Sequence, residues 1–159
     1  MNSRFGLSLL VASVGFATTI LAEKPPKDFQ DLMKSNGSII DISLGTVRSS
    51  VGAGAGQETG GTSLRRHIRE KNYDGLIADA TTLRNNFTKI EAFWTQRKVA
   101  DAIDWSKAAI TAANQLEAAA KARDDAGVGV AANAVAATCR DCHLKHRVIN
   151  LADGTFEIL

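Results

Sequence analysis

Residues 73–94, YDGLIADATTLRNNFTKIEAFW, carry the clearest structural pattern in this chain of 159 residues. Apolar side chains recur there at alternating intervals of three and four, at Tyr73, Leu76, Ala80, Leu83, Phe87, Ile90 and Trp94. This spacing places them along one stripe of an α-helix, the seam by which a helix packs in a bundle. The stretch therefore predicts a long helix with one buried face.

The stretch before it contains a second helical pattern, which opens after Pro25 and Pro26 with Asp28 near its start. A proline pair followed by an acidic residue is typical of a helix N-terminus. Its stripe comprises Phe29, Leu32, Met33, Asn36, Ile40, Leu44 and Val47. We expect a first helix here, weakened locally by Gly37 and Gly45.

Two further helices are predicted after residue 94, one from about Val99 to Ala122 and one from Asp124 or Asp125 to about His146. The predicted inward positions are Val99, Ile103, Ser106, Ile110, Ala113, Leu116 and Ala120 in the first, and Val128, Ala131, Val135, Thr138, Cys142 and His146 in the second. Alanine is abundant, and β-branched alternation is nearly absent. The predicted fold is all-α, an antiparallel four-helix bundle.

Residues 1–22 have the pattern of a secretory signal peptide. One cation, Arg4, precedes an apolar run from Phe5 to about Ala17, and no acidic residue is present. The run is shorter than the roughly 20 apolar residues of a membrane span. We expect cleavage after Ala22, with Ala17 as the alternative, and hence a periplasmic protein without a membrane span.

Residues 23–159 are predicted to form one domain. A Gly-rich loop, VGAGAGQETGGT, is expected near residues 51–62, followed by an added helical turn within SLRRHIREKN. The tail LADGTFEIL predicts a turn at Asp153-Gly154 and a short extended end. This part of the chain has 18 Lys and Arg against 17 Asp and Glu, a balance that argues against nucleic acid as a partner.

Residues 138–147, TCRDCHLKHR, contain both cysteines and two of the three histidines. On a helix Cys139, Cys142, His143 and His146 share one face but spread over roughly 10 Å, too far to converge on one zinc ion. Zinc would need His67 or a second chain as well. A redox dithiol belongs at a helix N-terminus beside a sheet, and this chain shows neither. Cys-x-x-Cys-His is the attachment sequence of haem c, and this chemistry fits best.

Three stretches together resemble the class II c-type cytochromes, the cytochrome c′ family: FQDLMKSNG, NFTKIEAFWTQRKVADAIDWSKAA and TCRDCHLKHR. The resemblance covers roughly residues 27–48 and 63–147; the Gly-rich insertion and the tail beyond Arg147 depart from the family pattern. It implies one haem c, covalently bound by Cys139 and Cys142, with His143 as the proximal iron ligand. It also implies a place for Arg147 beside His143 or the haem propionates, the alternative being a plain cation at the helix end.

The resemblance leaves two activities, which differ in the sixth iron position. LMKSNG resembles the branch in which a methionine of the first helix ligates iron, which implies Met33 as the ligand and single-electron transfer between redox partner proteins. The alternative is a five-coordinate cytochrome c′ that binds NO or CO, and an alternative of another class is a haem-free helical adaptor. We expect no substrate turnover. The resemblance also implies a possible homodimer, because family members often dimerise through their first two helices.

The other two histidines and the aromatic residues are not predicted to ligate the iron. His146 lies on the helix that supplies His143 and cannot reach the opposite side of the iron, and His67 is expected on the surface. The aromatic residues Phe29, Phe87, Phe93, Trp94 and Trp105 are interpreted mainly as bundle core.

Overall fold

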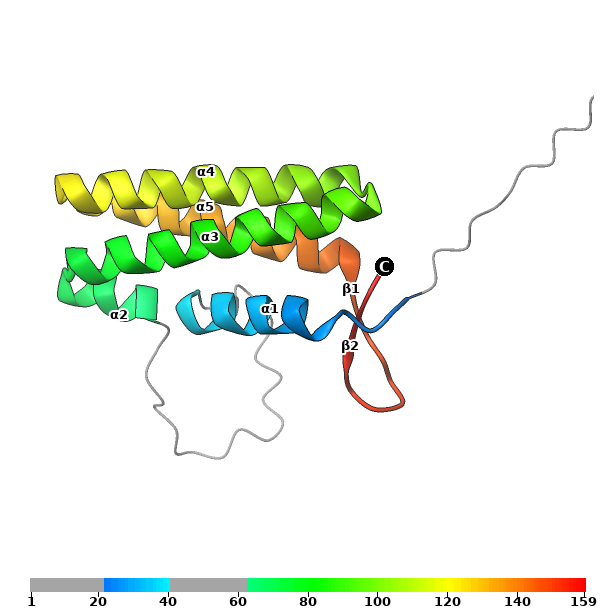
Figure 1. The fold of residues 1–159 in the computed structure, drawn as a ribbon. Helices are drawn as coiled ribbons and strands as arrows, with labels where there is room; N and C mark the ends of the chain where they lie inside the picture. Colours follow the sequence, from blue (N-terminus) through cyan, green and yellow to red (C-terminus); the bar gives the residue numbers. More distant parts are fainter. Residues whose placement is uncertain (1–21, 41–62) are drawn as a thin grey trace, which may run out of the picture.

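The computed structural model describes residues 22–40 and 63–159, which form five helices and one small hairpin (Figure 1). The elements are α1 (Lys27–Ile39), α2 (Ser63–Glu70), α3 (Tyr73–Arg97), α4 (Ala100–Ala122), α5 (Asp125–His146), β1 (Arg147–Ile149) and β2 (Phe156–Ile158). The all-α bundle is confirmed. Most of the predicted signal peptide and the Gly-rich loop lie outside the described residues and stay predictions.

Helices α3, α4 and α5 lie side by side as the long members of the bundle, and α1 packs along α3 (Figure 1). The connections between the three long helices are tight, because Lys98 and Arg123 adopt left-handed backbone conformations with φ of 58° and 55°. At the start of α5 the side chain of Asp124 accepts a hydrogen bond from the backbone N–H of Gly127 at 3.0 Å. Such short connections make successive helices antiparallel neighbours.

The predicted seam of α3 forms the centre of the core. Six of its seven residues are buried, and Tyr73 at the start is half-buried. In α4 four predicted positions are buried (Ser106, Ala113, Leu116 and Ala120), but the stripe also includes Ala102, Ala109 and Ala112. The predicted inward positions Val99, Ile103 and Ile110 are only half-buried. The buried face of α4 is thus rich in alanine, whose small side chain allows close packing.

Helix α1 is shorter than its apolar stripe predicts, since Ile40 already has an extended backbone. Phe29 fixes its start: this ring is buried, with its centroid 3.9 Å from that of Phe93 and 5.8 Å from that of Trp94. Leu44 and Val47, the last residues of the predicted stripe, lie outside the described residues. The helical turn expected before residue 73 is a separate helix, α2.

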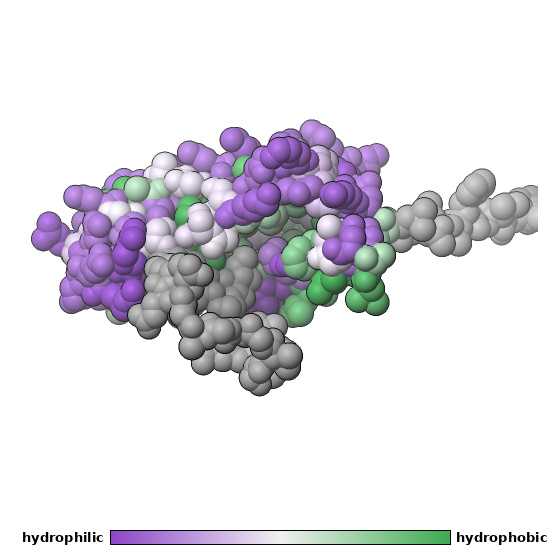
Figure 2. All heavy atoms as spheres, turned by 90° about the horizontal axis from the view of Figure 1, so that it is seen from below, coloured by the Kyte–Doolittle hydropathy of each residue, from purple (hydrophilic) through white to green (hydrophobic). Residues whose placement is uncertain are grey.

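The tail folds back as an antiparallel hairpin in which Arg147 pairs with Ile158. The predicted turn is confirmed: Gly154 has a φ of 70°, a conformation that favours glycine. Ile158 also exchanges backbone hydrogen bonds of 2.8 and 2.9 Å with Glu23, which ties the two ends of the domain together. Exposed apolar side chains of this region, including Ile149 and Leu151, give a hydrophobic patch at one end of the molecule (Figure 2).

Within residues 22–40 and 63–159, no helix combines the length and the apolar character needed to cross a bilayer.

Candidate cofactor-binding site

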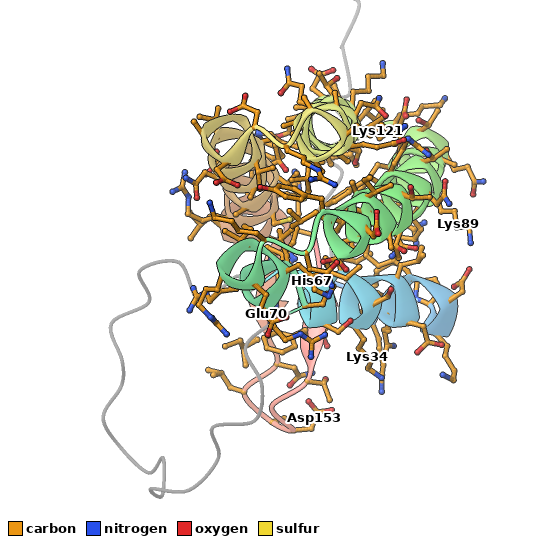
Figure 3. The ribbon with its side chains drawn as sticks, turned by 90° about the vertical axis from the view of Figure 1, so that its left-hand side faces the viewer. Lys34, His67, Glu70, Lys89, Lys121 and Asp153 are labelled. Atoms are coloured by element: carbon orange, nitrogen blue, oxygen red, sulfur yellow. The ribbon has the colours of Figure 1, made fainter. Side chains whose placement is uncertain are left out.

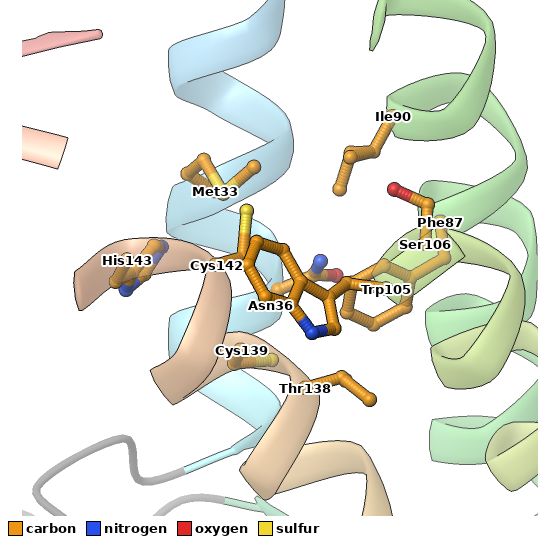
Figure 4. A pocket seen from close by; sticks show the side chains of 10 residues that line it. All are labelled: Met33, Asn36, Phe87, Ile90, Trp105, Ser106, Thr138, Cys139, Cys142 and His143. Atoms are coloured by element: carbon orange, nitrogen blue, oxygen red, sulfur yellow. The ribbon is translucent and has the colours of Figure 1, made fainter. Parts of the chain in front are cut away.

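A pocket of about 380 Å³, part of it open to solvent, lies where α1, α3, α4 and α5 meet (Figure 4). Its lining residues are Met33 and Asn36 of α1, Phe87 and Ile90 of α3, Trp105 and Ser106 of α4, and Thr138, Cys139, Cys142 and His143 of α5. Four of the five predicted site residues therefore line one pocket.

The two cysteines face this pocket from successive turns of α5. Cys139 is buried and Cys142 is half-buried, and neither forms a disulfide. Burial raises the pKa of Cys139 to about 12 and the pKa of Cys142 to about 11, so both thiols are protonated at neutral pH. A redox dithiol needs the opposite shift, a lowered thiol pKa. The surroundings therefore disfavour redox exchange and leave the two thiols in place for covalent attachment of a cofactor.

His143 follows Cys142 on the same helix and is also half-buried. Burial, and to a smaller extent the charge of Arg147, lowers the pKa of His143 to about 4. The imidazole is consequently neutral at physiological pH, which is the form that ligates metals.

Arg147 does not line the pocket but lies next to His143. Its Nη1 is 3.5 Å from Nδ1 of His143, the outer limit of a hydrogen bond. Arg147 is the first residue of β1, and its guanidinium lies 3.3 Å from the centroid of the Phe156 ring. The hairpin thus holds this cation beside the histidine.

Met33 approaches the pocket from another helix than His143. It is half-buried on α1, and Figure 4 shows it near Cys142 at the side of the pocket. Next along the same face is Asn36, which is 2 % exposed and whose amide nitrogen Nδ2 has no hydrogen-bond partner. In the sequence, Asn36 stands out as a polar residue on a stripe that is predicted to be buried.

The other two histidines lie outside the pocket. His146 is buried, with Nε2 3.1 Å from Oδ1 of Asp101. His67 lies on α2 (Figure 3), and its Nδ1 is 2.9 Å from Oδ2 of Asp79 on α3. The expected surface position of His67 is wrong, because Gly75 lets this ring pack against α3: a Cβ there would lie 2.7 Å from the ring.

The described residues offer no competing metal site. Across residues 22–40 and 63–159, no three His, Cys, Asp or Glu side chains gather in a way that could hold a metal ion. The pocket instead combines largely apolar walls with two thiols and one neutral imidazole on a single helix. This donor set fits haem c, whose two vinyl groups take two cysteines and whose iron takes the adjacent histidine.

The comparison with protein families agrees with this chemistry. Residues 72–147 match the family model described as Cytochrome C', and this match covers α3, α4 and α5 with the Cys-x-x-Cys-His sequence. Helix α1, with Met33, lies outside the matched residues. No curated protein and no solved structure matches the chain. The matched part of the chain is therefore similar to the cytochrome c′ family, whose members bind haem c covalently.

Proposed function

We propose that this protein is an exported monohaem cytochrome that carries single electrons between redox partner proteins. The observation that carries the proposal is that Met33 and His143 line one pocket from two different helices, α1 and α5. A histidine and a methionine are the axial ligands of electron-carrying c-type cytochromes, where the methionine raises the reduction potential. The bound haem supplies the redox chemistry by cycling its iron between the ferric and ferrous states.

The residues of α5 hold and orient this cofactor. Cys139 and Cys142 would form the two thioether bonds, and His143 would ligate the iron. Arg147, at 3.5 Å from His143, keeps a positive charge beside this ligand and favours its neutral form. The apolar side chains of Phe87 and Ile90 keep water away from the other wall.

Helix α1 would supply the sixth ligand. A methionine on an apolar stripe often only fills space in a core, so the position of the helix matters. The buried ring of Phe29 holds α1 one turn before Met33, and a hydrogen bond of 2.8 Å from Asn86 to Asn36 holds it one turn after. These two anchors bracket Met33 and fix its backbone at the pocket.

The second candidate function is a five-coordinate cytochrome c′ that binds NO or CO. One observation favours it: the family match includes α3 to α5 but not α1, so it supports the haem without supporting the methionine ligand.

Visible absorption spectra of wild type and Met33→Ala distinguish these functions. We expect low-spin haem in the wild type and high-spin haem in Met33→Ala, with faster CO binding to the ferrous variant because no internal ligand must first leave. Leu32→Ala is the matched control, since Leu32 is the half-buried neighbour of Met33 on α1 and should leave the haem low-spin.

Two results would contradict the proposal. High-spin haem and rapid CO binding in the wild type would make Met33 a core residue and favour the gas-binding function. A purified protein without haem absorption would leave the haem-free helical adaptor.

A further inference from the structure

Asn36 is a buried side chain whose amide is satisfied on one side only. Its Oδ1 accepts a hydrogen bond of 2.8 Å from Nδ2 of Asn86, which also donates to Oγ of Ser35 at 3.0 Å. The Nδ2 of Asn36 has no partner, although the residue is 2 % exposed. Buried amide donors are nearly always hydrogen-bonded. The unpaired Nδ2 of Asn36 therefore indicates that a bound group accepts a hydrogen bond from it.

The hydrogen bond between Asn36 and Asn86 determines where the unpaired NH₂ group of Asn36 points. Because Oδ1 of Asn36 faces Asn86, the NH₂ group of Asn36 must point away from Asn86. Asn36 lines the pocket, and Figure 4 shows the end of its side chain among the residues that surround it. Asn86 thereby fixes which end of the Asn36 amide is available to a bound group.

The two hydroxyl side chains of the pocket do not offer such a donor. Ser106 donates its hydroxyl to the backbone oxygen of Ala102 at 2.7 Å, and Thr138 donates to that of Val135 at 2.7 Å. Both hydroxyl protons are therefore used within their own helices. Apart from the ring nitrogens of Trp105 and His143, the amide of Asn36 is the side-chain donor of this pocket left for a ligand. An amide N–H selects an acceptor atom such as oxygen.

We propose that Asn36 donates a hydrogen bond to an oxygen acceptor inside the pocket, and that Asn86 is the residue that positions it. The inference rests on the proposed haem. It adds a hydrogen-bond donor on α1 to the two thiols and the imidazole that α5 supplies. The oxygen has two possible sources: a small ligand bound to the iron on the α1 side, or a carboxylate of the haem itself. While Met33 ligates the iron, the acceptor is the haem carboxylate. Once the iron is open on the α1 side, the small ligand becomes a neighbour of Asn36, because Met33 lies three residues before it on the same helix.

The test uses haem-loaded Met33→Ala protein, in which carbon monoxide can reach the iron, with and without Asn36→Leu. A donor next to bound CO lowers its C–O stretching frequency, so Asn36→Leu should move the infrared band to higher wavenumber. If the acceptor is a haem carboxylate, Asn36→Leu leaves the infrared band where it is. The pH at which the reduction potential changes should then move to a higher value, since a carboxylate that loses a hydrogen-bond donor has a higher pKa. Either shift supports the donor and identifies its source.

Asn85→Leu is the matched control, because Asn85 is an exposed neighbour of Asn86 and its replacement should move neither quantity. Asn86→Leu tests the positioning role independently: Asn36 remains but is free to turn, so the band or the potential should shift part of the way. Unchanged band and unchanged potential in both Asn36→Leu and Asn86→Leu would overturn the inference. A wild type without haem would instead refute the proposed function, so the two failures are distinguishable.

Discussion

Replacing Asn86 with leucine should lower the free energy of unfolding by about 1–3 kcal/mol. Asn86 is 8 % exposed and donates two hydrogen bonds from α3 to the side chains of Ser35 and Asn36 on α1. Leucine fills a similar volume but leaves Oδ1 of Asn36 buried without a donor, and an unsatisfied buried polar group costs roughly 1–3 kcal/mol. The loss of folding stability should therefore come from the unsatisfied oxygen, since the substitution creates little cavity.

A double-mutant cycle separates this pair from its surroundings. Once Asn36 is also leucine, no acceptor is left unsatisfied at this contact, and replacing both partners with apolar groups can be nearly neutral. The double variant should thus lose less than the sum of the two single losses, with an interaction energy of about 0.5–3 kcal/mol. Urea unfolding of the haem-loaded wild type, both single variants and the double variant measures it, with Asn85→Leu as an exposed control. Losses that add within about 0.5 kcal/mol would refute the buried contact between α1 and α3.

Three further predictions concern the anchoring of α1, the pH response and the cofactor. Phe29→Ala should cost about 3–5 kcal/mol in urea unfolding, since it removes a buried ring packed on Phe93 and Trp94; a loss below ~1 kcal/mol would mean that α1 is held elsewhere. A hydrogen bond from Lys145, and to a smaller extent His146, lowers the pKa of Asp101 below 3.8, so the stability advantage of wild type over Asp101→Asn should shrink as the pH falls below 3.8; a difference that does not change with acid would contradict it. Protein without haem should melt at a lower temperature than the loaded protein, because the cofactor binds only the folded form, and equal melting temperatures would argue against a haem inside the bundle.

Local sequence patterns were enough to predict the three long helices. The spacing from Tyr73 to Trp94 specifies a buried face without knowledge of its neighbours, and the structure has that helix from Tyr73 to Arg97. Asp124 marks the start of α5 because its carboxylate caps the first turn, an interaction between residues three apart. Such signals lie within one turn of helix and can be read directly.

The placement of the three α5 residues in one pocket was predictable for the same reason. Cys139, Cys142 and His143 form a contiguous motif on one helix, so their arrangement needs no tertiary contact. The hypothesis that Met33 ligates the iron rests on the family resemblance, because a methionine on an apolar stripe does not by itself indicate a ligand.

Contacts between distant segments could not be predicted. The burial of His67 depends on Asp79 and on the missing side chain of Gly75, both on another helix. The Asn36 and Asn86 pair joins residues 50 apart in the chain, and nothing near either residue indicates the other. Pairing of the tail with Glu23 likewise brings opposite ends of the domain together.

The central claim, that Cys139 and Cys142 hold haem c covalently, is tested most directly by intact mass measurement after extraction with acidified acetone. Wild-type protein made in cells with c-type cytochrome maturation should keep the mass of one haem after this treatment. Cys139→Ala and Cys142→Ala should each weaken retention, and the double variant should lose all its haem to the solvent. Haem that is extracted from the wild type, or that stays bound to the double variant, would contradict the claim.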